Sequence, residues 1–151
     1  MQPREWTRGA FVISTDRSRV DVEAVHRFLS GDSYWSPGIP LEVVRRGIEN
    51  SLPFGVYRDR EQVGFARVTT DFATFAYLAD VYVLDAVRGQ GLGKWLVETI
   101  MTHPELQGLR RWMLVTRDAH GLYARHGFTP LKAPERVMER HDPDVYRRGR
   151  S

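Results

Sequence analysis

The feature that most constrains this chain is an apolar strand that runs into a glycine-rich turn and then into an amphipathic helix. The stretch reads Asp80-Val81-Tyr82-Val83-Leu84 and reaches the helix through Arg88-Gly89-Gln90-Gly91-Leu92-Gly93-Lys94. Backbone N–H groups at a helix N-terminus lack partners within the helix, and the helix dipole makes that end favourable for anions. The pattern therefore predicts an anion site, and the expected ligand carries phosphate.

The spacing of the glycines narrows the kind of phosphate site. A P-loop would need a glycine where Arg88 stands and a Ser or Thr where Trp95 stands, so that site is excluded. A dinucleotide fingerprint counted from Gly89 and Gly91 would place its third glycine at Lys94, which weakens that interpretation too. The pattern that remains is Arg-x-x-Gly-x-Gly.

This pattern resembles the pyrophosphate-binding motif of the GNAT superfamily of N-acetyltransferases, which likewise follows a strand ending in Val. The family's later Leu-Tyr-x-x-x-Gly-Phe element reappears here as Leu122-Tyr123-Ala124-Arg125-His126-Gly127-Phe128. Two motifs in the same order are more specific than one, and they extend the resemblance over most of the chain.

Composition sets the class of protein. The 151 residues, 42% of them hydrophobic, predict one domain over residues 1–151, with about 144–151 as a flexible tail. There is no cysteine, and the five histidines lack metal-ligand spacing, so we expect no disulfide and no metal. Without a signal-like start or an apolar run of about 18 residues, we expect a soluble cytoplasmic protein with no membrane partner.

The net charge is +3, but charges of both signs are mixed along the chain, which makes nucleic-acid binding unlikely as a function. The one dense basic cluster, Arg147, Arg148 and Arg150, is explained by a solvated C-terminus. A homodimer stays open, because the sequence does not separate surface aromatic residues from core ones.

Hydrophobic periodicity predicts an α/β or α+β domain. Helices are expected to begin near Val22, Leu41, Leu92 and Ala119. Strands are expected at residues 11–15, 54–57, 63–69, 75–84 and 112–115, with 128–131 and 136–140 closing the sheet. The resemblance implies a mixed, mostly antiparallel central sheet flanked by helices, with a splayed pair of parallel strands.

In the family, acetyl-CoA lies between those two parallel strands, which here correspond to residues 75–84 and 112–115. The resemblance implies that backbone groups from Val81 through Tyr82 to Val83 pair with the pantetheine arm, and that a backbone N–H near Val81 polarises the thioester carbonyl. It also implies that residues 88–94 hold the pyrophosphate. Transfer is expected to be direct, because no cysteine and no Gly-x-Ser-x-Gly turn is present to carry the acyl group.

Tyr123 is the candidate general acid. The family's acid is a Tyr at this place in the Leu-Tyr-x-x-x-Gly-Phe element, and a phenol is protonated at neutral pH and can donate to the leaving sulfur. The alternative is a tyrosine that only packs on its short helix.

Asp80 is the candidate base, although a charged residue in an apolar strand could equally be paired for structural reasons. Strand alternation predicts that Asp80 shares a face with Tyr82, and that Tyr77 and Ala79 lie on the other face with Val81 and Val83. A water chain to bulk solvent could replace a dedicated base.

Tyr34 and Trp35 are the candidate acceptor-binding residues, because the loop between the first two helices frames the amine pocket in the family. They could stack on the acceptor or cover a cationic amine. Aromatic side chains beside Pro37 and Pro40 could also simply cover the core.

Taken together, the sequence predicts an N-acetyltransferase that uses acetyl-CoA as co-substrate and acts on a primary amine of a small molecule or peptide. The alternative is a non-catalytic acyl-CoA-binding sensor or interaction module on the same fold. Nucleic-acid binding through the arginine-rich end ranks last.

Overall fold

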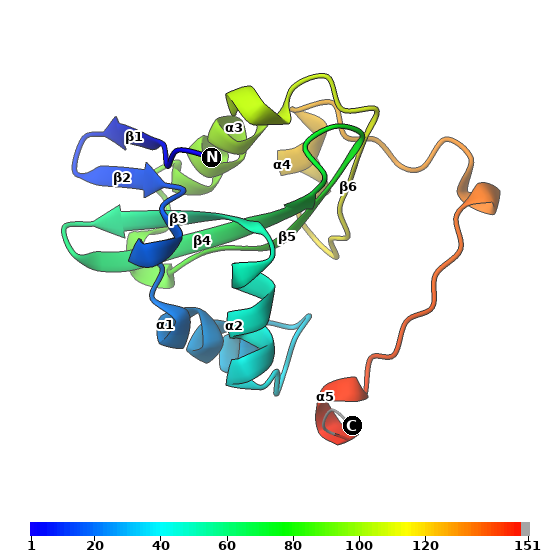
Figure 1. Ribbon diagram of the computed structural model, residues 1–151, viewed down its shortest axis with the longest axis horizontal. Coiled ribbons are helices and arrows are strands. Elements are labelled where there is room, and N and C mark those ends of the chain that lie inside the picture. Colours follow the sequence, from blue (N-terminus) through cyan, green and yellow to red (C-terminus); the bar gives the residue numbers. More distant parts are fainter. Residues whose placement is uncertain (149–151) are drawn as a thin grey trace.

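The computed structural model describes residues 1–148, which form one six-stranded sheet with helices on both faces (Figure 1). The strands are β1 (Glu5–Arg8), β2 (Phe11–Ser14), β3 (Leu52–Arg58), β4 (Glu61–Thr70), β5 (Phe75–Val83) and β6 (Arg111–Met113), in that order across the sheet. All neighbours pair antiparallel except β5 and β6, which are parallel. The predicted mixed, mostly antiparallel sheet is confirmed.

The helices divide between the two faces of the sheet. They are α1 (Val22–Arg27) with a π turn at Phe28–Asp32, α2 (Leu41–Glu49), α3 (Leu92–Met101), α4 (His120–Ala124) and α5 (Val145–Arg148), besides short 3-10 turns. Figure 1 shows α1 and α2 below the sheet and α3 and α4 above it. We call the two apolar clusters they bury the α3-side core and the α1/α2-side core.

Each core follows from the spacing of apolar residues. Leu92, Leu96 and Ile100 lie on one face of α3 and are buried against the sheet in the α3-side core. Val44 and Ile48 lie on one face of α2 and are buried against the sheet in the α1/α2-side core. Burial of each such side chain contributes roughly 1.5–3 kcal/mol, so the two helices are held mainly by packing.

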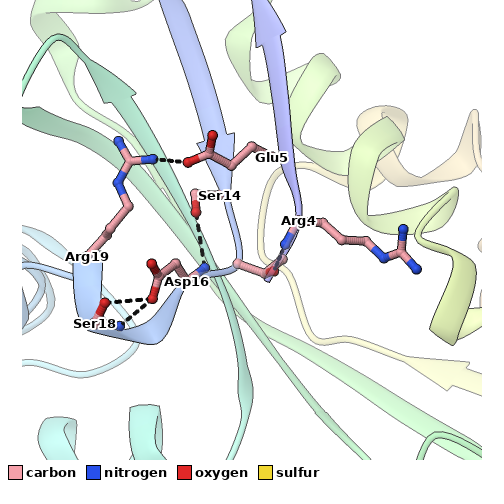
Figure 2. A network of polar contacts seen from close by, with 7 residues as sticks. Arg4, Glu5, Ser14, Asp16, Ser18 and Arg19 are labelled. Atoms are coloured by element: carbon pink, nitrogen blue, oxygen red, sulfur yellow. Dashed lines mark hydrogen bonds and ion pairs between the residues drawn. The ribbon is translucent and has the colours of Figure 1, made fainter. Parts of the chain in front are cut away.

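The N-terminal edge of the sheet is fixed by a polar network (Figure 2). The Asp16 carboxylate accepts from the backbone N–H of Ser18 at 3.0 Å and from its hydroxyl at 2.7 Å, and these bonds lower the pKa of Asp16. The Asp16 backbone N–H donates to the Ser14 hydroxyl at 3.0 Å, and Arg19 forms an ion pair with Glu5. Strand β1, which the sequence analysis missed because its residues are mostly exposed, is thereby tied to the turn after β2.

The C-terminal part differs from the prediction. Strand β6 ends at Met113 and is only half-buried, and residues 128–131 and 136–140 form no strand, so the prediction of two closing strands is wrong. No strand within residues 1–148 covers the outer edge of β6. Instead the segment of residues 129–148, which we call the C-terminal arm, runs away from the sheet and ends at α5 (Figure 1).

The predicted tail, about residues 144–151, falls partly outside the described residues. Within them it forms α5, and Tyr146 packs against the α1/α2-side core.

Candidate active site

The strand that precedes the glycine turn contains a β-bulge at Asp80. Phe65 of β4 faces Tyr82 and Arg67 faces Ala79, so Asp80 and Val81 share the space opposite one residue of β4. Asp80 adopts a left-handed backbone conformation with φ +57°, which is uncommon for any residue except glycine. The bulge therefore places an acidic side chain at a bend in the middle of β5.

The β-bulge shows that the predicted assignment of residues to the two faces of β5 is partly wrong. Asp80 does share a face with Tyr82, but Tyr77 and Ala79 lie on that face too, because they pair with Thr69 and Arg67 on the same side of β4 as Phe65. Val81 and Val83 pack toward the α3-side core, as Ala76 and Leu78 do. The extra residue shifts the alternation by one, which a strict period of two does not anticipate.

The parallel strands separate after three residue pairs. The register joins Phe75 to Arg111, Ala76 to Trp112 and Tyr77 to Met113, and there the pairing ends. From Leu78 to Val83, β5 has no strand partner on its β6 side within residues 1–148. Backbone groups of β5 are thus left open beside the α3-side core.

The glycine turn has the geometry that an anion site needs. Gly89 and Gly91 have φ of +84° and +76°, and Gly91 is the N-cap of α3 with no side-chain hydrogen bond to the helix. A Cβ added at Gly89 or Gly93 would meet nothing within 4 Å, so the approach to the backbone is open. The ten-residue helix α3 therefore begins with uncapped N–H groups at its positive end.

The other predicted phosphate-site residues differ in what they can offer. Arg88 and Lys94 are exposed cations beside the turn, although Arg88 already pairs with Asp85 at 2.5 Å and donates to the Val83 carbonyl at 3.1 Å. Gln90 is exposed and donates to the Val87 carbonyl at 3.2 Å. Leu92 is buried in the α3-side core, so only its backbone faces the turn.

Tyr82 offers only its backbone to the same site. Its ring is stacked on Phe28 at 3.8 Å between ring centroids, on the α1/α2 side of the sheet. Burial raises the pKa of Tyr82, so its phenol stays neutral.

Tyr123 lies on α4, and only 8% of its surface is exposed. Its ring contacts that of Phe128 edge-on at 6.0 Å, and its hydroxyl forms no hydrogen bond within residues 1–148. Burial, with smaller contributions from Tyr34 and Asp118, raises the pKa of Tyr123 to about 12. The hydroxyl is therefore a protonated and unoccupied donor at neutral pH.

The structure brings Asp80 and Trp35 together, although they are far apart in the sequence. The Trp35 indole N–H donates to Oδ1 of Asp80 at 3.0 Å, and Nε of Arg67 donates to Oδ2 at 2.6 Å. The Asp80 side chain is 10% exposed. Both carboxylate oxygens are thus engaged by donors, as burial of a charge requires.

Tyr34 connects the same loop to the segment that follows β6. Its hydroxyl accepts the backbone N–H of Arg117 at 2.9 Å, and the Arg117 guanidinium lies over its ring at 3.8 Å from the centroid. Its ring meets that of Trp35 edge-on at 5.0 Å. Tyr34 and Trp35 are 42% and 39% exposed, so neither is a core residue.

Arg67 and Arg117 were missed by the sequence analysis. A charged residue within the apolar run of β4 was a signal for Arg67, since it needs a partner there. Arg117 contacts Tyr34 across 83 positions of sequence, and no local pattern could have indicated that contact.

Two negative findings apply to the described part of the chain. No group of three or more potential metal-ligating side chains comes together there. None of its helices has the length and apolar character needed to cross a lipid bilayer.

Comparisons with known proteins agree with this geometry. The GNAT acetyltransferase domain model matches residues 49–130. A crystal structure of a Xanthomonas campestris GNAT protein is 54% identical, covers 90% of this chain and 96% of its own, and superposes with a TM-score of 0.88. A protein of Gibberella zeae is 35% identical over 83% of this chain and 82% of its own. Both relatives are named "putative acetyltransferase".

A more distant structure, from Clostridium acetobutylicum, is described as an acetyltransferase with acetyl-CoA. It is 15% identical, covers 93% of this chain and 95% of its own, and has a TM-score of 0.61, so the likeness concerns the fold. The family model and the close relatives show that this chain belongs to the GNAT family of acetyltransferases.

Proposed function

We propose that this protein is a cytoplasmic N-acetyltransferase that transfers the acetyl group of acetyl-CoA directly to a primary amine of a small molecule or peptide. The observation that carries the proposal is the open length of β5 from Leu78 to Val83, which leads straight into the uncapped N-terminus of α3. An extended ligand with a phosphate group at one end fits both features at once.

The chain supplies the contacts for acetyl-CoA mainly through its backbone. Open β5 groups at Val81 to Val83 suit the amide-containing arm, and N–H groups at Gly89 to Gly93 suit the pyrophosphate, with Arg88 and Lys94 adding positive charge. The Arg88 guanidinium would have to exchange some of its contact with Asp85 for phosphate.

In the reaction, the amine nitrogen attacks the thioester carbonyl carbon, the carbon–nitrogen bond forms, and the carbon–sulfur bond breaks. A backbone N–H near Val81 polarises the carbonyl as negative charge develops on its oxygen. The Tyr123 phenol donates to the departing sulfur, because its raised pKa of about 12 keeps it protonated and its hydroxyl is free. The proton lost by the amine passes to water or to a base.

Asp80 has a different role from that of a free base. Its two oxygens accept from Arg67 and Trp35, so its first effect is to hold the Tyr34–Trp35 loop against β5. Trp35 and Tyr34 then form an exposed aromatic wall on the side where the amine would enter. Such a wall favours an amine attached to an apolar or aromatic group.

Calorimetric titration with acetyl-CoA tests the proposal, with CoA and ATP as comparators. We expect saturable binding of both CoA species, weakened in Arg88→Ala and unchanged in Arg60→Ala, a matched exposed arginine in the turn between β3 and β4. An amine panel followed by mass spectrometry should then reveal an acetylated product. Absence of binding to either CoA species would exclude the proposal.

A second candidate is a non-catalytic acyl-CoA-binding sensor. The engagement of both Asp80 oxygens favours it, because no unoccupied carboxylate is left at this position to accept the amine proton. Tight binding of acetyl-CoA without turnover of any amine in the panel would support the sensor over the enzyme.

A further inference from the structure

The N-terminal strand β1 brings an arginine to the glycine turn from far away in the sequence. Alternate residues of a strand point to the same face, and Trp6 of β1 packs against the α3-side core, so Arg8 points to that side too. Figure 1 shows β1 at the edge of the sheet, beside α3. We propose that Arg8 binds a phosphate group of acetyl-CoA and that Trp95 holds it in position. This inference rests on the proposed function, because it concerns the ligand of that same site.

The first observation is the position of the Arg8 guanidinium. Its Cζ atom lies 5.9 Å from the centroid of the Trp95 ring, which is within the range of a cation–π contact. Its Nη2 atom lies 4.0 Å from the position that a Cβ on Gly91 would occupy. Because Gly91 has no side chain, the guanidinium lies directly beside the start of α3.

Helix geometry explains why Trp95 can place this cation beside Gly91. The backbone N–H of Trp95 donates to the Gly91 carbonyl at 3.0 Å. Residues four positions apart lie on the same face of a helix, one turn from each other. The Trp95 ring therefore supports the guanidinium on the face that leads to the uncapped N–H groups of α3.

The sheet fixes the other end of the Arg8 side chain. Strand β1 pairs with β2 along its whole length, from Glu5 opposite Ser14 to Arg8 opposite Phe11. The ion pair of Glu5 with Arg19 ties the strand to the turn after β2. The backbone of Arg8 thus belongs to a paired strand, and its side chain is placed from there.

The second observation is that no acid balances the charge of Arg8. Both Arg8 and Lys94 are exposed, and neither forms an ion pair within residues 1–148. Two unbalanced cations thus lie at the positive end of the helix dipole, although cations are stabilised at the opposite end of a helix. An anion bound between them would remove this repulsion.

The chemistry of the guanidinium fits a phosphate group. Its N–H donors form a planar fork that matches two phosphate oxygens, and its charge strengthens both hydrogen bonds. A phosphate oxygen lies about 2.9 Å from a nitrogen that donates to it, so a group bound at the start of α3 is within reach of Arg8. The glycine turn would supply backbone donors, and the distant strand β1 would add a cation.

Calorimetric titration of the full chain with CoA is the first test. Arg8→Met keeps an unbranched apolar stem over Trp95 and removes the charge, so we expect the Kd of CoA to rise about tenfold. Arg46→Met is the matched control. Arg46 is also exposed and forms no ion pair within residues 1–148, and it lies on α2, across the sheet from α3, so its Kd should stay unchanged. An unchanged Kd in Arg8→Met, or an equal rise in both variants, would overturn the proposal.

A second ligand identifies which phosphate group Arg8 binds. Dephospho-CoA keeps the pyrophosphate and lacks the 3′-phosphate. A tenfold loss in Arg8→Met with both ligands assigns Arg8 to the pyrophosphate, and a loss with CoA alone assigns it to the 3′-phosphate. Either loss should shrink between about 50 mM and about 500 mM NaCl, because salt screens an exposed charge. A loss that salt leaves unchanged would mean altered packing and would overturn the role of the charge.

Substitutions of Trp95 test how Arg8 is held. Trp95→Leu keeps an apolar side chain against the α3-side core but removes the aromatic ring, so it should weaken CoA binding, whereas Trp95→Phe should retain it. In the presence of Arg8→Met, the further loss from Trp95→Leu should disappear. Additive losses would overturn the positioning role of Trp95.

The same titrations separate this inference from the proposed function. If the unsubstituted protein binds neither CoA nor acetyl-CoA, both proposals fail. If it binds both ligands and Arg8→Met binds them equally well, only the assignment of Arg8 is wrong.

Discussion

The two sides of the candidate site are constructed differently. The side proposed for phosphate comes from one continuous stretch, Val81 to Lys94, in which positive-φ glycines and a helix N-terminus follow one another. The side proposed for the acceptor joins Trp35, Arg67 and Asp80 across as many as 45 positions of sequence. The first is a property of local backbone conformation, and the second exists only after the sheet and its loops have packed.

This difference has a consequence for substitutions. Changes in the glycine turn should act through backbone conformation and affect the ligand's phosphate end. Changes on the acceptor side should act through coupled hydrogen bonds, so that single substitutions are not additive. Four predictions test this distinction, beginning with the residue that would carry chemistry.

Tyr123→Phe should give the largest effect. Removing the hydroxyl that the proposed mechanism assigns as the acid should lower kcat by about 10²-fold or more, with little change in the dissociation constant of acetyl-CoA. Steady-state kinetics and calorimetry measure the two quantities. Tyr57→Phe is the control, because its buried hydroxyl has no hydrogen-bond partner in the described structure and its removal should leave kcat unchanged. An unchanged kcat in Tyr123→Phe would remove this residue from the mechanism.

Gly91→Ala should separate the phosphate side from the acceptor side. A Cβ at φ +76° costs about 1–2 kcal/mol, and relief of that strain would displace the N–H groups at the start of α3. We expect lower stability to urea and an acetyl-CoA affinity reduced by about tenfold. Gly31→Ala is the control, because that glycine has no positive φ and open space around it. Equal effects from both variants would show that the left-handed turn is unimportant.

Trp35→Phe and Asp80→Asn should reveal coupling on the acceptor side. Trp35→Phe removes the donor of the 3.0 Å bond, and Asp80→Asn removes the negative charge and leaves one acceptor oxygen for two donors. A double-mutant cycle on kcat/KM should give a coupling free energy of about 1 kcal/mol. The effect should appear mainly in the KM of the amine. The cycle of Trp35→Phe with Asp71→Asn is the control and should be additive, since those residues share no bond. Additivity in the first cycle as well would mean that the Trp35–Asp80 contact does not shape the site.

Asp71→Asn should give the smallest effect, confined to stability. The Asp71 carboxylate accepts from Thr74 and from the backbone N–H groups of Ala73, Thr74 and Phe75, and these bonds hold its pKa well below the usual range. A carboxyl group whose pKa is lower in the folded state stabilises that state when the pH is above its pKa in the unfolded chain, about 3.9. The stabilisation disappears as the pH falls through its pKa in the folded state. Urea unfolding should therefore show that the variant has a lower free energy of unfolding than the unsubstituted protein at neutral pH. This difference should become smaller in acid. A difference that is constant with pH would contradict this origin.

Several features of the fold were predictable because they are local. The strand β5, the glycine turn and α3 follow from periodicity and glycine spacing, and the structure places all three within a few residues of the expected positions. The turn before β5 is also local, since the Asp71 carboxylate accepts four hydrogen bonds from residues 73–75. The assignment of acetyl-CoA and of Tyr123 to the site stays a prediction from resemblance.

Apart from the missed strand β1, the errors concern relations between segments. The bulge at Asp80 reversed the predicted faces of Tyr77 and Ala79, because pairing with β4 sets where the alternation shifts. The two closing strands failed, because a strand requires a partner edge as well as a suitable sequence. Arg67 and Arg117 were found only when packing brought them to Asp80 and Tyr34.

The sequence by itself determined the order of the elements from β2 to α4, the glycine turn before α3 and the absence of a cysteine nucleophile. These depend on backbone preferences and on residue types, which act over a few positions. Only the tertiary structure decided how far β5 and β6 diverge, which donors hold Asp80, and that the arm leaves its own sheet. Those outcomes depend on burial and on pairing between distant segments, and their free energies appear only when the whole chain has packed.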